Sequence, residues 1–287
     1  MRTNIIFLEG LPGSGKTVFS RRLENDFKML MPIKKYEEGE LNPLDFGYLA
    51  IMDKKEYKHL LIQFNDIRDD IEAVSTNLGS FIMTAFTKVK RPSLDDAFYQ
   101  TFSRYQLTEV NDFEYFKKTT FNLWKAFVES YDQDTLYLYG GAFLQNQYEA
   151  LWLKYGLNLK EMQDYFKELI NIIKPLNPLI IYIYQPNVSA AIKRTAKKRQ
   201  AIYTGAFKDW FELVKASLMN MPLAKQKGYL EDEGAYRFYR DEQTFECEIL
   251  KQKYYNHIKV ELNNDYDAVY NQIYESVNHV LKGLKDG

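Results

Sequence analysis

Cysteine is almost absent from this chain: Cys247 is the only one, so no disulfide can form within it. The three histidines, His59, His257 and His279, show no metal-ligand spacing. Excess charge is also missing, because 38 Lys and Arg face 39 Asp and Glu. The single cysteine leads us to expect a reducing environment. The balanced charge makes nucleic acid an unfavoured partner, since proteins that bind nucleic acid usually have a positive surface potential.

Long hydrophobic runs are missing as well. The longest, PLIIYIY at residues 178–184, has the length of a strand and not the roughly 20 residues that span a bilayer. The apolar start NIIFL runs into a glycine-rich segment and not into a cleavage region. With 46% hydrophobic and 27% charged residues the composition is that of a globular protein. We expect a cytoplasmic protein without a membrane partner.

What the chain does contain is GLPGSGKT at residues 10–17, which meets the pattern G-x-x-x-x-G-K-[ST]. Residues 4–9 before it are apolar and β-branched at the centre, which predicts a buried parallel strand. After it, Phe19, Leu23 and Phe27 recur at helical spacing. Strand, glycine loop (residues 10–17) and amphipathic helix therefore follow in the order that phosphate binding requires.

The residue types of the glycine loop suit a nucleotide. Its backbone N–H groups and the positive start of the next helix would hold the β-phosphate. Lys16 is placed to reach the β- and γ-phosphate oxygens, and the Thr17 hydroxyl to bind Mg²⁺. A turn that merely joins strand to helix would leave the Lys-Thr pair unexplained. We predict that ATP and Mg²⁺ bind here, with contacts from Gly10, Leu11, Pro12, Gly13, Ser14, Gly15, Lys16 and Thr17.

Strands and helices alternate along most of the chain, which favours an α/β fold with a parallel sheet covered on both faces. We predict one three-layer domain over residues 1–287, with about five parallel strands. Residues 44–131 have a mostly helical pattern and form a predicted helical insertion between the second and third strands. Further strands are predicted at residues 33–37, 134–141, 179–184 and 257–262. Further helices are predicted near residues 142–156, 159–178, 190–200, 207–218, 241–255 and 268–284.

The class of nucleotide-binding protein follows from other segments. The chain has neither the N-K-x-D segment of GTPases nor the L-S-G-G-Q segment of transporter ATPases. An N-terminal glycine loop, an acidic segment after the second strand and an Arg-rich helix after the fourth resemble the P-loop nucleoside and nucleotide kinases. These include the thymidylate kinase-like and chloramphenicol phosphotransferase-like branches. EGELNP at residues 38–43 and FLQNQ at residues 143–147 resemble segments of poorly characterised bacterial P-loop proteins of this group.

The resemblance implies a general base at Glu38. In kinases of this group a carboxylate at the end of the second strand accepts the proton of the attacking hydroxyl. Glu37 and Glu40 are its neighbours and remain alternatives. A solvated acidic turn explains the same residues equally well.

The resemblance also implies a lid helix in the basic segment at residues 190–200. There Arg194 and Arg199 would stabilise the transferred charge, because an arginine fork suits a planar phosphoryl group better than lysine does. Lys193 and Lys197 share one stripe of this helix, and Arg194 and Lys198 share the next. A solvated basic face and a nucleic-acid contact are the alternatives.

The third strand departs from the kinase pattern. It ends in Gly140 and Gly141, where kinases and ATPases commonly have an acid that holds Mg²⁺ through water. Either Glu9, Glu38 or another acid replaces it, or the protein binds nucleotide without efficient turnover. Gln145 could orient a water molecule or a substrate but cannot supply the charge.

Two further segments bear on the ligands. The turn NNDYD at residues 263–267 lies where related kinases hold adenine, and it also has the composition of an Asx-rich helix start. The insertion is the predicted acceptor-binding region, because ligands lie beyond the carboxyl ends of strands. The aromatic residues that could line it, or else form plain core, are Phe46, Tyr48, Phe81, Phe98, Tyr99 and Tyr105.

The combined prediction is an ATP-dependent kinase for a small acceptor such as a nucleoside, nucleotide or antibiotic. Its expected catalytic residues are Lys16, Glu38, Arg194 and Arg199. The alternatives are a nucleotide-binding switch with weak hydrolysis and an NTPase that acts on a macromolecule. The near-zero net charge is an argument against the last of these.

Overall fold

The structure is a computed structural model that describes residues 3–36, 41–44, 49–89, 96–200, 210–263 and 265–282. It divides into two compact units. The first comprises Met1–Lys35, Asp134–Ile170 and Leu176–Gly287, and the second comprises Tyr36–Gln133 and Asn171–Pro175. The second unit therefore contains the segment that was predicted as an insertion.

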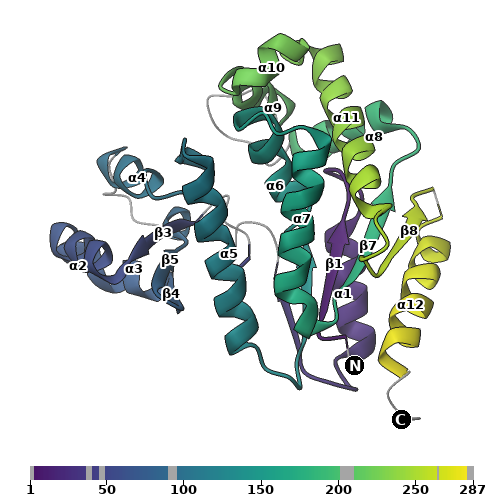
Figure 1. Cartoon of the computed structure of the whole chain (residues 1–287), viewed down its shortest axis with the longest axis horizontal. Coiled ribbons are helices and arrows are strands. Elements are labelled where there is room, and N and C mark those ends of the chain that lie inside the picture. Colours follow the sequence, from purple (N-terminus) through teal and green to yellow (C-terminus); the bar gives the residue numbers. More distant parts are fainter. Residues whose placement is uncertain are drawn as a thin grey trace. The chain divides into compact units, whose positions relative to one another are not determined.

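The first unit is built on a five-stranded parallel sheet with the order β2-β6-β1-β7-β8 (Figure 1). The prediction of about five parallel strands is confirmed. The central strand β1 pairs with β6 on one side and β7 on the other, and each of its residues is buried. The strands are β1 (Ile5–Glu9), β2 (Ile33–Tyr36), β6 (Leu136–Gly140), β7 (Leu179–Tyr184) and β8 (His257–Glu261).

Helices cover both faces of this sheet. Alternate residues of a strand point to opposite faces, so neighbouring residues of β1 contact different helices. One face carries Ile6 and Leu8 of β1, which share a core with α1 (Lys16–Phe27) and α12 (Tyr266–Lys282). The opposite face carries Phe7, whose ring lies 5.4 Å from that of Phe143. Phe143 in turn packs on Phe166 of α7 (Leu159–Ile173). The layers are therefore helix, sheet, helix, as predicted.

The remaining helices of the first unit follow β6 and β7. The predicted helix at residues 142–156 is α6 (Gln145–Glu149) followed by a π-helical turn, Ala150–Lys154. After β7 come α8 (Val188–Gln200), α9 (Trp210–Met219), α10 (Pro222–Lys227) and α11 (Asp232–Leu250). The helix predicted at residues 241–255 is α11, which begins at Asp232 and ends at Leu250. None of the helices in the described part of the chain has both the length and the apolarity to cross a membrane.

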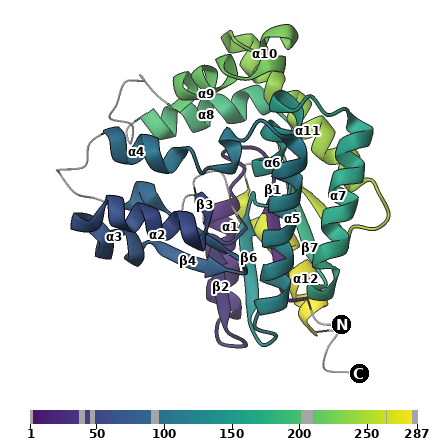
Figure 2. The same ribbon diagram turned by 60° about the vertical axis from the view of Figure 1, so that its left-hand side comes forward.

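The second unit contains a sheet that the helical pattern did not predict. Its strands are antiparallel in the order β3-β5-β4, namely β3 (Ala50–Asp53), β4 (Ser75–Leu78) and β5 (Phe81–Thr84). Figure 2 shows α2 (Lys54–Gln63) and α3 (Arg68–Ala73) beside these strands. The unit also contains α4 (Asp96–Ser103) and α5 (Phe113–Ser130). The predicted insertion is therefore mixed and not purely helical.

The aromatic side chains predicted for this segment mostly build its core. Phe98 is buried in a cluster with Phe102, and Tyr105 packs against the same cluster. Tyr99 is exposed, with its ring edge-on to Phe98. Phe81 lies in β5, whereas Phe46 and Tyr48 lie outside the described residues.

Candidate functional site

The glycine loop leaves the carboxyl end of β1 in a conformation that requires glycine. Gly10, Gly13 and Gly15 have φ angles of 129°, 78° and 92°, in the region that other residues avoid. There is also no room for a side chain at two of these positions. A Cβ on Gly13 would lie 1.8 Å from Thr195 Oγ1, and one on Gly10 would lie 2.5 Å from the Ile183 carbonyl oxygen. The loop is therefore held closely between β7 and α8.

The helix α1 begins without a cap. Gly15 occupies the N-cap position, no side chain accepts a hydrogen bond from the first turn, and that turn contains no acid. The first N–H groups of a helix have no partner within it, and the helix dipole makes this end positive. An anion is the ligand that best satisfies such a terminus.

Three side chains of the glycine loop lie near the start of α1. Lys16 Nζ donates to the carbonyl oxygens of Gly10, at 2.6 Å, and Leu11, at 3.1 Å. Thr17 is exposed at the first turn of α1. Ser14 is fully buried and its Oγ has no partner among the described residues. Lys16 thus folds back over the loop that it is predicted to serve.

Glu9, one of the acids considered for Mg²⁺, has a different contact. Its two carboxylate oxygens accept hydrogen bonds from the N–H groups of Phe143, at 2.8 Å, and Gln145, at 3.2 Å. Burial raises the pKa of Glu9 to about 7, although those N–H groups and Lys16 oppose the rise. Glu9 therefore anchors the turn between β6 and α6 to the end of β1.

That turn brings amide side chains to Lys16. Gly141 has a φ of 76°, and a Cβ there would lie 3.1 Å from Gln145 Oε1 and 3.5 Å from Lys16 Cε. Gln145 Oε1 and Asn146 Nδ2 have no partner among the described residues. The structure thus places an acceptor and a donor where the sequence lacks the expected acid.

Glu9 has three acidic neighbours that the sequence analysis missed: Glu242 and Glu246 are buried, and Glu149 is half-buried. We name Glu9, Glu149, Glu242 and Glu246 the acid cluster. Burial raises the pKa of Glu242 well above its usual range, and repulsion from Glu246 and Glu149 adds to the effect. Burial likewise raises the pKa of Glu246 to about 8, while Lys16 lowers it. Several ionisable groups with such shifts at the end of a sheet mark a candidate functional site.

The signal for this cluster was present in the sequence. Glu242 and Glu246 are four residues apart on α11, on the same stripe as the buried Tyr239 and Leu250. Acids at core positions of an amphipathic helix break the usual pattern and point to a polar environment inside the fold. Only tertiary structure shows that this environment is next to Lys16.

Comparisons with known proteins find no family model and no curated protein that matches this chain. The candidate site therefore rests on its own geometry.

The other predicted acids add little to the site as described. Glu38 and its neighbours Glu37 and Glu40 lie outside the described residues. No three His, Cys, Asp or Glu side chains in the described ranges are arranged to hold a metal ion. Thr17 is thus the predicted Mg²⁺ ligand whose position the structure gives.

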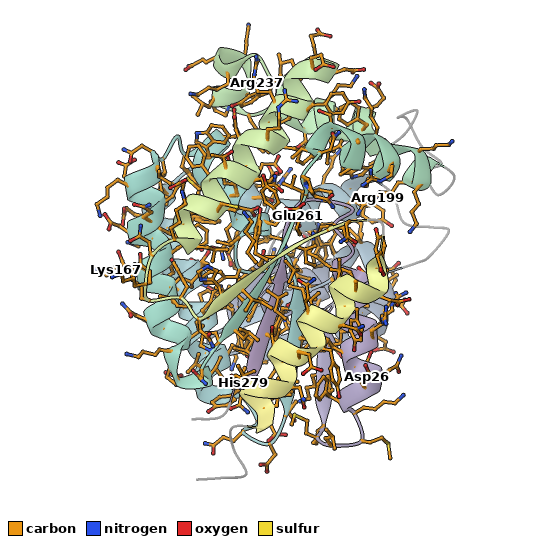
Figure 3. All side chains as sticks on the ribbon, turned by 90° about the vertical axis from the view of Figure 1, so that its right-hand side faces the viewer. Asp26, Lys167, Arg199, Arg237, Glu261 and His279 are labelled. Carbon is orange, nitrogen blue, oxygen red and sulfur yellow. The ribbon has the colours of Figure 1, made fainter. Side chains whose placement is uncertain are left out.

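The predicted lid helix is α8, and it touches the glycine loop through Thr195. Arg194 is exposed, and the guanidinium of Arg199 lies 4.8 Å from the centre of the Trp210 ring (Figure 3 labels Arg199). Lys193 likewise lies over the Tyr236 ring, at 5.1 Å. The helix that carries both predicted arginines therefore contacts the loop, but Arg199 itself is engaged with α9.

The described residues of the predicted turn at 263–267, which are 263 and 265–267, lie at the start of α12 and make the hydrogen bonds of a helix start. Asp265 Oδ1 accepts a hydrogen bond from Ala268 N at 2.9 Å, and Asp267 pairs with Arg22 at 2.6 Å. Tyr266 is 41% exposed, and its ring lies 5.8 Å from that of Phe19. A Cβ added at Gly15 would lie 3.4 Å from the Tyr266 ring. An aromatic face thus borders the end of the glycine loop.

Proposed function

We propose that the protein is an ATP-dependent phosphotransferase with a small-molecule acceptor. The observation that carries the proposal is the uncapped start of α1 behind three glycines with positive φ, with Lys16 folded over them. In parallel sheets ligands bind beyond the carboxyl ends of the strands, where the chain crosses from one side of the sheet to the other. The glycine loop follows the central strand β1 at such a point.

In this proposal the nucleotide phosphates bind the N–H groups of the loop and of the first turn of α1. Lys16 then exchanges the carbonyl oxygens of Gly10 and Leu11 for phosphate oxygens, whose negative charge it stabilises. Thr17, which is exposed at the first turn of α1, would hold Mg²⁺, and the metal would supply charge neutralisation for the phosphates. Tyr266 would stack on the adenine base.

The remaining roles follow from position. Arg194 is proposed to contact the transferred phosphoryl group from α8, since the neighbouring Thr195 touches Gly13. Gln145 and Asn146 would orient the attacking hydroxyl, because their free amide atoms lie near Lys16. Glu38 stays a prediction as general base, and residues 44–131 stay the predicted acceptor-binding region.

The test is a mass-spectrometric screen of a mixed metabolite and antibiotic pool with Mg-ATP. Wild-type protein is compared with Lys16→Ala and with Lys28→Ala, a matched control at the other end of α1, where Lys28 bonds Asn25. We expect an acceptor that gains phosphate with the wild type and Lys28→Ala but not with Lys16→Ala. Equal phosphorylation by all three proteins, or none by any, would reject the kinase.

A second candidate is a nucleotide-binding switch. It is favoured by Gly140 at the end of β6 and by Glu9, whose two oxygens are both used by the turn after β6. In this case ATP binds but neither transfers its phosphoryl group nor is hydrolysed rapidly. Tight ATP binding together with an empty acceptor screen would support it.

A further inference from the structure

The acid cluster lies at the same edge of the sheet as the glycine loop because of strand register. Glu9, the last residue of β1, is paired with Tyr182 of β7. The Tyr182 hydroxyl donates a hydrogen bond to Glu246 Oε2 at 2.6 Å, and Glu242 lies one turn earlier on α11. Lys16 is close enough to influence the titration of both acids. The cluster is therefore a neighbour of the proposed phosphate site.

Three oxygen atoms at this place have no hydrogen-bond partner among the described residues: Glu242 Oε2, Glu246 Oε1 and Tyr148 Oη. Their side chains are only 3%, 0% and 1% exposed. The Tyr148 ring packs on Phe238 and Phe245 of α11, which lie one turn on either side of Glu242. Burial raises the pKa of the Tyr148 hydroxyl, and the charges of Glu242 and Glu246 add to the rise. Buried polar atoms without a partner are rare in native proteins, so a ligand or a water molecule is the expected partner of these three oxygens.

The chemistry of the three oxygens restricts the kinds of chemical group that could bind them. A primary ammonium group has a positive charge and three N–H donors, which equal in number the three oxygens without a partner. A guanidinium is a planar fork of five donors and matches them poorly. A metal ion is disfavoured, since the described residues include no group of acids, His or Cys arranged to hold one. The phosphates of a nucleotide are anionic and would be repelled.

We infer that the acid cluster binds the primary ammonium group of the phosphoryl acceptor, so that the acceptor is an amino alcohol or an amino sugar. The inference rests on the proposed phosphotransferase function. Glu149 is the member of the cluster that reaches the surface, where it accepts a hydrogen bond from Ser217 at 3.0 Å. A hydroxyl on the same molecule would then extend from the cluster toward Lys16.

The charged and titratable groups around the acid cluster also determine how the protonation of Glu242 and Glu246 changes when an ammonium group binds. Glu9, Glu149, Tyr148 and Tyr182 face Glu242 and Glu246, and Lys16 is the cation on that side. Burial favours the protonated forms of the two carboxyls of α11, because it raises the pKa of both. An ammonium group favours their charged forms, so its binding releases protons to the buffer.

The first test measures binding and needs no phosphoryl transfer. Methylammonium chloride is the probe, with sodium chloride and tetramethylammonium chloride at the same ionic strength as controls. The proteins are the wild type, Glu242→Gln, Glu246→Gln, the double variant, and Glu248→Gln as a matched control at the helix surface, where it pairs with Lys251. Thermal unfolding and calorimetry in two buffers of different ionisation enthalpy report binding and proton release.

We expect methylammonium alone to raise the unfolding temperature of the wild type and of Glu248→Gln, with release of protons at pH 7. Each single glutamine variant should bind it at least about tenfold more weakly, since a buried charge pair is broken. A wild-type response no larger than that to sodium chloride, or an equal response in the double variant, would overturn the inference.

The second test distinguishes failure of the ammonium-site inference from failure of the proposed kinase activity. A pool of amino alcohols and amino sugars and its N-acetylated copy are incubated with Mg-ATP and the wild type or the double variant. Phosphorylation confined to free amines, and lost in the double variant, supports both proposals. Phosphorylation of N-acetylated compounds at an equal rate overturns the ammonium site but leaves the kinase. Methylammonium binding without any phosphorylation leaves the site and rejects the kinase.

Discussion

Gly13 combines two constraints that can be separated by mutation: a backbone with a φ of 78° and a neighbour, Thr195, that leaves no room for a Cβ. Gly156 has a similar φ of 70° but nothing within 4 Å of an added Cβ. Gly156→Ala should therefore cost about 1 kcal/mol of unfolding free energy, from backbone strain alone. Gly13→Ala should cost more and should abolish ATP binding.

The control for this prediction is Thr195→Ala in the Gly13→Ala background. It removes the hydroxyl that the new Cβ meets, so part of the lost stability should return while the backbone strain remains. Urea unfolding and ATP titration of the variants measure both effects. Equal stability of Gly13→Ala and Gly156→Ala would show that the contact with α8 is absent.

Glu9 is predicted to make stability depend on pH. Its pKa is about 7 in the folded protein and that of an ordinary glutamate when unfolded, so the folded state holds an extra proton between these values. Its contribution is fully present below the unfolded pKa and is lost as pH rises through 7, a change on the order of 3 kcal/mol. Relative to the wild type, Glu9→Gln should therefore gain stability as pH rises from 4 to 8.

Urea unfolding across that pH range measures this difference, with Glu233→Gln at the exposed surface of α11 as the control. The control should follow the wild type at every pH. A constant difference between Glu9→Gln and the wild type would mean that the pKa of Glu9 in the folded protein equals that of an ordinary glutamate.

At the scale of the element, α8 is the helix whose role is most open. A solvated basic face predicts no effect of changing Arg194, whereas a lid predicts loss of turnover. We expect Arg194→Ala and Arg194→Lys to lower kcat roughly 10- to 100-fold with little change in ATP affinity, because lysine cannot reproduce the arginine fork. Lys160→Ala on α7, where Lys160 pairs with Asp164, is the control. Wild-type turnover in both Arg194 variants would remove α8 from the mechanism.

The start of α12 gives a second prediction at this scale. If Tyr266 stacks on the base, Tyr266→Ala should weaken ATP binding about tenfold, and Tyr266→Phe should leave it unchanged, since stacking needs only the ring. Tyr254, which is similarly exposed, provides Tyr254→Ala as a control. Calorimetric titration measures the affinities. Equal affinities for Tyr266→Ala and Tyr254→Ala would assign the turn to helix capping alone.

The elements also show what sequence can predict. The strands of the main sheet and the glycine loop were found because their signals are local: apolar runs, glycines and a Lys-Thr pair. The small sheet was missed because β4, STNL, has no apolar alternation, and the only local signal for its hairpin with β5 is the two-residue Gly79-Ser80 turn. Glu242 and Glu246 were missed because their meaning depends on Glu9, which is far away in sequence and adjacent only through strand register.

At the scale of the whole molecule, the two units predict two unfolding transitions. The residues proposed to bind nucleotide all lie in the first unit, while the second has its own core around Phe98 and Phe102. A ligand stabilises only the part that binds it, by about 2.7 kcal/mol at a concentration a hundredfold above its Kd. Mg-ATP should therefore raise the temperature of one calorimetric transition by several degrees and leave the other unchanged. Lys16→Ala should lose this shift, while a single transition that moves as a whole would show that the units unfold together.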